Sequence, residues 1–349
     1  MSAALRVVSP GLCTTVQDLG RSGHQRLGIP VSGALDPVSL RAANALVGNP
    51  ADMGALELLY LGPTLMVEAE SAAMSFAGAD AIIEVFAGTE ATHGRRVTTM
   101  RSIRLPRGAV VRIGRLTRGS ALYVAVEGGF AIEPVLGSVS TYIRGNLGGW
   151  QGRALVAGDR LPLCRMSASN RGDRRLEGVD VSVPARVRAI AGPQSDYFSQ
   201  AQIEAFFAGE FTVGAGSDRM GMRLMGPKVE HCRGFDIVSD GIAPGSIQIA
   251  GSRQPIVLLA DRQTTGGYPK IATVISADMP ALGRLPIGAR IAFDRVGLSE
   301  AEALRRKLSA EIDGIPARVV PLEEAAQPAP NLLDLNLISG VVDARAAAV

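Results

Sequence analysis

Apolar residues occur along most of the chain in short runs that are closed by glycine, proline or aspartate. Short runs of this kind, separated by turn residues, are typical of strands in sandwiches and barrels. The runs that we predict to be strands are Leu65–Val67, Ala81–Phe86, Ala109–Ile113, Ala121–Val126, Val187–Ile190, Ile256–Ala260 and Ile271–Ile275. The hydrophobic pattern therefore predicts a mainly β protein.

Three segments carry signals for the start of a helix. Asp36 precedes a proline, as an N-cap residue often does, whereas Ser199 and Ser299 each precede a Gln or Glu by three positions. Apolar residues then recur at helical spacing, and Gly48 and Gly209 end the first two segments. We expect a few short helices beginning at these three residues.

The chain divides at a polar, arginine-rich stretch that is poor in apolar residues. We predict an N-terminal β half over 1–165, a linker over 166–185 and a C-terminal β half over 186–313. The tail, 314–349, is rich in Ala and Pro, and we expect it to be loosely ordered or to dock on a partner. Weak similarity between short motifs of the two halves is compatible with a duplication or with chance.

Composition excludes several classes of protein. The net charge of +3 is too small for a nucleic-acid footprint, and 4% aromatic residues leave few stacking platforms. No stretch approaches 18 uninterrupted apolar residues, which argues against a membrane-spanning helix. The three cysteines are widely separated and form no cluster with the three histidines, so we expect no metal site. The N-terminus lacks a signal-peptide pattern, and we predict a cytoplasmic protein.

The first candidate for chemistry is a glycine-bounded loop near the N-terminus that contains Gln17, Asp18 and Arg21. Such a loop can present a guanidinium to a carboxylate or phosphate, with Asp18 orienting Arg21. The alternative is a structural turn that contains an Asp–Arg pair.

The second candidate is Asp261–Lys270, which lies between two apolar runs. One alternative is a hairpin whose paired glycines supply the tight turn. The other is a ligand loop, in which the glycine backbone approaches a ligand and a compact ammonium anchors an anion. The residues that would serve such a loop are Gln263, Thr264, Gly266, Gly267, Tyr268 and Lys270, the last being one of three lysines in the chain.

Two further polar segments are possible loops at the mouth of a barrel. One contains Arg219 and is followed by Gln248, and the other contains Ser140 and Thr141. Each segment is equally compatible with turns that satisfy their own backbone groups. No GxSxG elbow and no GxxxxGK[ST] phosphate loop occurs in the sequence.

Together, these segments resemble the biotin-dependent carboxyltransferase family, which is also called allophanate hydrolase subunit 2, KipA or the 5-oxoprolinase C component. The resemblance extends from about residue 5 to about residue 300. The blocks that carry it are, in order, Cys13–Arg21, Gly33–Asp36, Ala43–Asn49, Ala55–Glu57, Gly137–Thr141, Gly148–Leu155, Gly192–Asp196, Ser217–Gly221, Gly245–Gln248 and Gln263–Lys270.

The resemblance implies two cyclophilin-like β-barrel halves with a few short helices. It also implies a complex with a B component of the KipI or allophanate hydrolase subunit 1 type and with a 5-oxoprolinase A component. That assembly opens 5-oxo-L-proline to L-glutamate, coupled to ATP hydrolysis. The alternatives are a carboxyltransferase component of a urea carboxylase-like system, acting on urea or another small amide, and a non-catalytic KipA-type regulator that binds a KipI-type kinase inhibitor.

ATP is expected at the level of the complex. Biotin, if it is used, is expected on another chain, because no lysine here is flanked by methionines. From residue chemistry, we predict that Lys270, Gln263, Thr264 and Asp18 are catalytic. Asp18, Asp36 and Glu57 are candidate general bases, with Asp36 the weakest because N-capping explains it. The predicted substrate-binding residues are Arg21, Gln17, Arg219, Gln248, Gly266, Gly267, Tyr268, Ser140 and Thr141.

Overall fold

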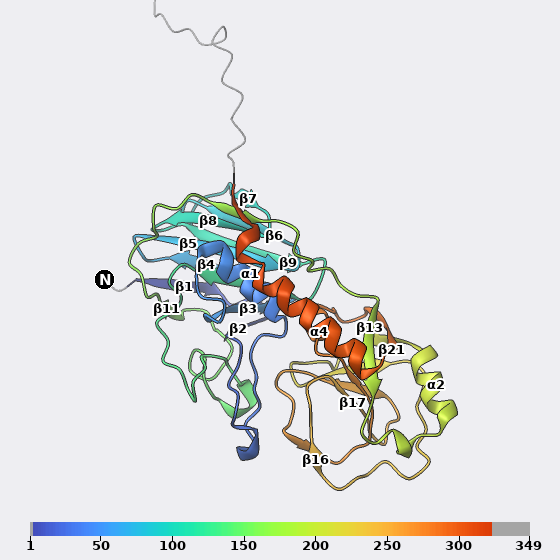
Figure 1. Ribbon diagram of the computed structural model, residues 1–349. Helices are drawn as coiled ribbons and strands as arrows, with labels where there is room; N and C mark the ends of the chain where they lie inside the picture. Colours follow the sequence, from blue (N-terminus) through green and yellow to red (C-terminus); the bar gives the residue numbers. More distant parts are fainter. Residues whose placement is uncertain (1–2, 323–349) are drawn as a thin grey trace, which may run out of the picture.

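The computed structural model describes residues 3–322 and has two β-rich halves (Figure 1). The predicted mainly β class is confirmed. The N-terminal half contains two sheets. In spatial order, the six-stranded sheet comprises β11 (Arg160–Pro162), β1 (Ala4–Ser9), β4 (Thr64–Val67), β9 (Val110–Leu116), β6 (Ala81–Phe86) and β7 (Arg95–Val97). The seven-stranded sheet comprises β2 (Cys13–Gln17), β3 (Ala55–Leu59), β10 (Ala121–Val126), β5 (Ser71–Gly78), β8 (Arg101–Pro106), β12 (Arg174–Leu176) and β22 (Val319–Pro321).

The C-terminal half is a closed barrel in which β13 and β21 pair in parallel. Its strands, in order around the barrel, are β13 (Arg186–Ala191), β20 (Lys270–Val274), β17 (Ser246–Ile249), β18 (Pro255–Leu258), β15 (Gly221–Met225), β14 (Glu210–Val213) and β21 (Arg290–Arg295). A separate two-stranded ribbon consists of β16 (Asp240–Gly241) and β19 (Thr265–Gly266). Because β17 lies between β18 and β20, the hairpin interpretation of Asp261–Lys270 is wrong.

The described helices are few. The α-helices are α1 (Pro37–Val47), α2 (Gln200–Ala208), α3 (Met279–Leu282) and α4 (Leu298–Asp313), and the 3-10 helices are η1 (Gln25–Leu27), η2 (Ile143–Gly145), η3 (Ser195–Tyr197) and η4 (Pro316–Arg318). No helix within residues 3–322 is long and apolar enough to cross a membrane.

Two of the three predicted helix starts are confirmed. The Asp36 side chain accepts hydrogen bonds from two amides in the first turn of α1, and Ser199 caps α2 through the amide of Gln202. The third is wrong, because Gly297 is the N-cap of α4 and Ser299 lies within its first turn. Gly48 ends α1 in the left-handed conformation, which glycine adopts without a Cβ clash.

Successive side chains along a strand point to opposite faces, so the seven-stranded sheet has two different faces. On β10, Leu122 and Val124 face the core between the two sheets, whereas Tyr123 faces the side that α1 covers. On β3, Leu56 faces the same core, and Glu57 is the cross-strand neighbour of Tyr123. The pattern therefore places a carboxylate and a phenol next to each other on the α1 side of the sheet.

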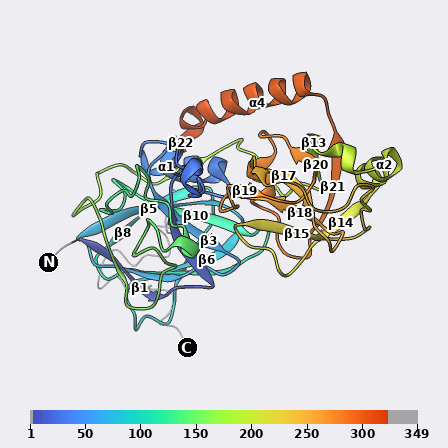
Figure 2. The ribbon, with the colours of Figure 1, turned by 90° about the horizontal axis from the view of Figure 1, so that it is seen from below.

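The chain connects the two halves twice. Residues 166–185, which we expected to form a linker, also contribute β12 to the N-terminal sheet. After the barrel, α4 runs alongside both halves (Figure 2), and β22 then pairs with β12. The tail that we expected from residue 314 thus begins with η4 and β22, and its remainder, 323–349, lies outside the described residues.

Candidate functional site

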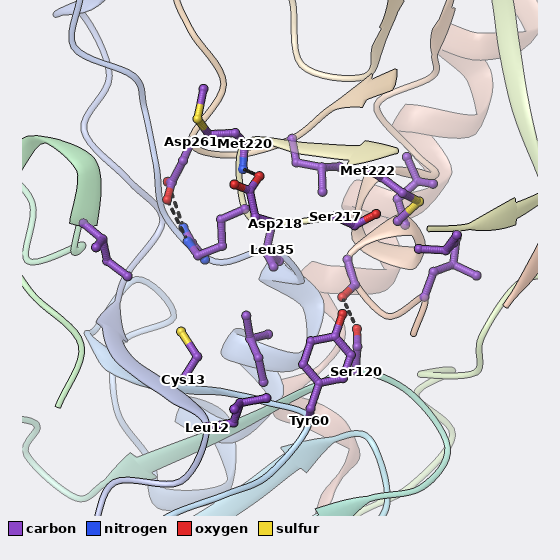
Figure 3. Close-up of a pocket in the computed structure, with 18 of the residues that line it drawn as sticks. Leu12, Cys13, Leu35, Tyr60, Ser120, Ser217, Asp218, Met220, Met222 and Asp261 are labelled. Atoms are coloured by element: carbon purple, nitrogen blue, oxygen red, sulfur yellow. Dashed lines mark hydrogen bonds and ion pairs between the residues drawn. The ribbon is translucent and has the colours of Figure 1, made fainter. Parts of the chain in front are cut away.

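A cavity of about 310 Å³ lies between the two halves (Figure 3). From the N-terminal half, Leu12, Cys13 and Tyr60 line it, and from the C-terminal half, Met220 and Met222 do so. Most of the lining is apolar. The rim has an ion pair of its own between the halves, because Arg144 Nη2 lies 2.9 Å from Asp218 Oδ2. The cavity therefore offers an apolar interior with charged groups at its edge.

A buried ion network forms one wall of this cavity. Arg219 donates to both carboxylate oxygens of Asp261, over 2.9 and 3.0 Å, and to Glu57 of the N-terminal half. It also donates to the carbonyl of Gly33, so that all of its guanidinium nitrogens are engaged. Burial alone would lower the pKa of Arg219, but the carboxylates of Glu57 and Asp261 outweigh it and raise that pKa. Arg219 thus joins the halves, and its predicted role in substrate binding stays a prediction.

Glu57 extends the network into the N-terminal sheet. Its Oε2 accepts a hydrogen bond of 2.6 Å from the Tyr123 hydroxyl and one of 2.8 Å from the amide of Leu35. Burial, together with the negative charge of Glu57, raises the pKa of Tyr123 well above its usual value. Burial also raises the pKa of the nearby Cys13 thiol, which disfavours a reactive thiolate in this cavity.

Asp18 lies in a second cluster, at the end of β2. Its carboxylate accepts hydrogen bonds from Ser138 Oγ (2.6 Å), from Ser140 Oγ and from the backbone amides of Gly20 (2.7 Å) and Val139 (2.8 Å). It thereby fixes the loop 138–140 against the start of the chain. We expected Asp18 to orient Arg21, but its carboxylate is instead bonded to these hydroxyls and amides.

Arg21 and Gln17 lie beside the same loop. Arg21 Nη2 donates to the Ser140 carbonyl, and Gln17 Nε2 donates to the Thr141 carbonyl over 3.1 Å. Within the described residues, Arg21 Nη1 and Gln17 Oε1 are buried without a hydrogen-bond partner. Burial lowers the pKa of Arg21. The structure thus brings together five predicted residues: Asp18, Arg21, Gln17, Ser140 and Thr141.

Lys270 begins β20 and is at the centre of a third cluster. Its side chain is 2% exposed, and its Nζ lies 3.1 Å from Oδ2 of Asp240 on the β16–β19 ribbon. Gln194 Nε2 lies 3.3 Å from the same oxygen, and Gln194 Oε1 accepts from the backbone amide of Lys270. These hydrogen bonds from Lys270 and Gln194 lower the pKa of Asp240.

Two side-chain amides lie close to Gly266 of the ribbon. A Cβ on Gly266 would lie 2.7 Å from Gln248 Nε2 and 2.9 Å from Gln263 Nε2. A side chain at this position would force these two amides to shift. The neighbouring residues Thr264 and Gly267 hold the ribbon through their carbonyls, which accept from Ile242 and Ile237. Tyr268 is partly exposed beside them.

The predicted site residues thus lie in three places rather than in one. The Asp18 cluster is near the ion network, since Asp261 acts electrostatically on Arg21, whereas the Lys270 cluster lies under the ribbon. Sequence reasoning missed Tyr123, Asp240 and Gln194. Tyr123 lies within an apolar run and Asp240 within an irregular polar stretch, so neither carried a signal. Among residues 3–322, no group of three or more His, Cys, Asp or Glu side chains is arranged to hold a metal.

Comparisons with known proteins place this geometry in context. Residues 27–295 match the family described as "Carboxyltransferase domain, subdomain A and B". The chain is 38% identical to the C component of 5-oxoprolinase from Escherichia coli (strain K12) over 304 residues, which cover 86% of this chain and 94% of that protein. It is 29% identical to the urea amidolyase of Saccharomyces cerevisiae, of which it spans 18%. The crystal structure of the K. lactis urea amidolyase superimposes with a TM-score of 0.79 at 27% identity, covering 93% of this chain and 21% of that one.

Proposed function

Because the chain belongs to the carboxyltransferase domain family, subdomains A and B, we propose that it is the C component of an ATP-dependent 5-oxoprolinase. The assembly would hydrolyse the lactam of 5-oxo-L-proline to L-glutamate, with ATP hydrolysis driving the reaction. The observation that carries the proposal is the 38% identity to a 5-oxoprolinase C component across 94% of that protein's length. We infer that a KipI-like B component and a 5-oxoprolinase A component complete the complex.

A carboxyltransferase component for urea, or for another small amide, is the second candidate. It is supported by the urea amidolyase relatives and by the similar fold of the K. lactis enzyme. The support is weaker because identity is lower and because this chain corresponds to less than a fifth of that relative's length. Biotin would then be carried elsewhere, since Lys228, Lys270 and Lys307 have no methionine neighbours.

Within the proposed enzyme, Lys270 is the residue best suited to the reaction. A buried ammonium that shares an acceptor with the Gln194 amide can hold a carboxylate or stabilise an oxyanion as negative charge develops. Gln263 and Thr264 lie on the same loop and would complete this group. Asp18 already accepts four hydrogen bonds, so in our proposal it supplies a fixed charge that shapes the Arg21 loop rather than taking up a proton.

The decisive experiment is ADP release by this chain purified together with its two partner components, A and B. We expect 5-oxo-L-proline to stimulate ADP release with formation of glutamate, and urea to have no effect. Stimulation by urea alone would favour the carboxyltransferase alternative. No stimulation by either, from a complex that assembles, would reject the 5-oxoprolinase assignment.

The regulator alternative requires an interface and no chemistry. Lys270→Met separates it from the enzyme, because a regulator would bind its KipI-type partner and act normally without this ammonium. Arg219 is unsuited to the same test, since its ion pairs join the two halves and its loss would disturb folding.

A further inference from the structure

The Lys270 cluster contains more hydrogen-bond donors than acceptors. Lys270 has three N–H groups, Gln248 is its cross-strand neighbour on β17, and the side-chain amides of Gln248 and Gln263 both lie close to Gly266. Gln248 is 3% exposed, and among the described residues no partner accepts from its Nε2. The acceptor for the Lys270 ammonium is one oxygen of Asp240, which Gln194 Nε2 shares.

Asp240 is an unusual counter-ion for a buried lysine. Its side chain is 52% exposed, and it comes from a strand of two residues outside the barrel. Its second oxygen accepts from the amide of Gly241, so it offers Lys270 a single contact at 3.1 Å. A buried ammonium needs a paired charge, and a buried amide donor without an acceptor is destabilising. Asp240 supplies the charge for the Lys270 ammonium but leaves the Gln248 amide without an acceptor.

A carboxylate ligand would both pair with the Lys270 ammonium and accept a hydrogen bond from the Gln248 amide. We propose that Asp240 is an internal stand-in for a small carboxylate, which binds between Lys270 Nζ and Gln248 Nε2, displaces Asp240 and releases the β16–β19 ribbon. The identity of the ligand rests on the proposed function, because 5-oxo-L-proline is itself a carboxylate. The existence of the site rests on the donors alone.

The charge of the site favours a carboxylate over a phosphate. Once Asp240 is displaced, Lys270 provides one formal positive charge beside neutral amides. One positive charge balances a carboxylate, whereas a phosphate group carries about −1.5 to −2 at neutral pH. A planar carboxylate also presents two oxygens, which can accept from the ammonium and from an amide together.

The ribbon is built so that it can move. It is held by the two strand pairs of β16 with β19, by the amides of Ile237 and Ile242, which donate to the carbonyls of Gly267 and Thr264, and by Arg262 Nε, which donates to the Ile242 carbonyl over 3.2 Å. Next to these contacts, Val238 is 92% exposed. Figure 1 shows β16 in a long loop at the lower edge of the C-terminal half. Few contacts must break for Asp240 to leave Lys270.

The test compares the full-length chain with its Asp240→Asn variant by isothermal titration calorimetry with 5-oxo-L-proline, acetate and phosphate. Because Asp240 is half exposed, solvent screens its pair with Lys270 to about 1 kcal/mol or less, so removing the competitor should tighten carboxylate binding by up to about fivefold. Lys270→Met in the same background should abolish binding. If Asp240→Asn does not fold, Asp240→Ser removes the same charge.

Lysine labelling localises the ligand. Lys228 and Lys307 are exposed and serve as internal controls in the same sample. An acylating reagent should modify Lys270 faster in Asp240→Asn than in the natural chain, and 5-oxo-L-proline should slow that modification without affecting the other two lysines. If acetate protects Lys270 from labelling as well as 5-oxo-L-proline does, the carboxylate alone is recognised. If acetate protects it less well, the site also contacts the lactam. Both outcomes support the site.

Three results would overturn the inference: unchanged carboxylate affinity in Asp240→Asn, an equal gain for phosphate, or ligand binding that leaves Lys270 labelling unaffected. The proposed function and the proposed carboxylate site can be rejected independently of each other. If carboxylates bind as predicted but the assembled complex releases no ADP with 5-oxo-L-proline, the 5-oxoprolinase assignment is rejected and the carboxylate site remains.

Discussion

Arg284 of the C-terminal half donates to both carboxylate oxygens of Asp36, the N-cap residue of α1, over 2.7 and 3.3 Å. Both side chains are buried. The same carboxylate accepts from the amides of Val38 and Ser39, so one group caps the helix and binds the other half. This pair attaches the C-terminal half to α1, and the Glu57–Arg219 pair attaches it to β3 of the N-terminal sheet.

Arg284→Met should therefore be strongly destabilising. It leaves the Asp36 carboxylate buried without its cation, and breaking a buried pair in this way costs about 3–5 kcal/mol. Urea denaturation measures the loss. The matched control is Arg306→Met, which removes an exposed pair on α4 and should cost about 0.5 kcal/mol or less. Equal effects of the two variants would contradict the role of Arg284.

Gly148→Ala should disrupt the Arg21 cluster. Gly148 has a φ of +68°, and a Cβ there would overlap the Ser140 carbonyl and Arg21 Nη2. Overlap and left-handed strain together should cost about 2–5 kcal/mol. In the control Gly158→Ala, φ is +92° and nothing lies within 4 Å of the new Cβ, so strain alone remains. Thermal unfolding that is the same for both variants would argue against the close approach.

Tyr123 should make stability depend on pH in the alkaline range. Its pKa is raised in the folded protein, so its contribution is complete below the unfolded value of about 10 and declines as pH rises through the folded value. We expect the stability difference between the natural chain and Tyr123→Phe to shrink above pH 10, by up to about 1.4 kcal/mol per pH unit. Urea denaturation of the two proteins at a series of pH values around 10 measures this difference.

Lys270→Met should abolish 5-oxo-L-proline-dependent ADP release by the assembled complex, while leaving the chain folded and able to assemble. Methionine has a similar length without the charge, so it fills the buried space and removes the ammonium. Circular dichroism and co-purification with the partners verify folding and assembly. The exposed Lys307→Met is the control. Full activity of Lys270→Met would reject Lys270 as an anion anchor.

The strands and α1 were predictable because their signals are local. Ala81–Phe86 and Ala121–Val126 match β6 and β10, and the Asp36–Pro37 signal marks the start of α1. The start of α4 was missed by two residues because glycine, a weaker N-cap signal than serine, occupies the capping position.

The arrangement of the candidate site was not predictable in the same way. No sequence signal indicated that the fold brings Arg219 to Glu57, which lies far away in the sequence, and to Asp261. Glu57 and Tyr123 are in contact because their side chains lie on the same face of the paired strands β3 and β10. This contact depends on how the strands pair, and no sequence motif indicates it. Likewise, the register of β16 with β19 brings Asp240 to Lys270.

The pairing of β12 with β22 has a consequence for synthesis on the ribosome. The barrel strands lie between these two strands in sequence, so the barrel is complete in the nascent chain before β22 emerges. Until then, β12 presents an unpaired edge of N–H and C=O groups, which is a template for association with other chains. The first half to be translated is thus the last to be finished, and during translation the protein depends on its own C-terminal residues to close that edge.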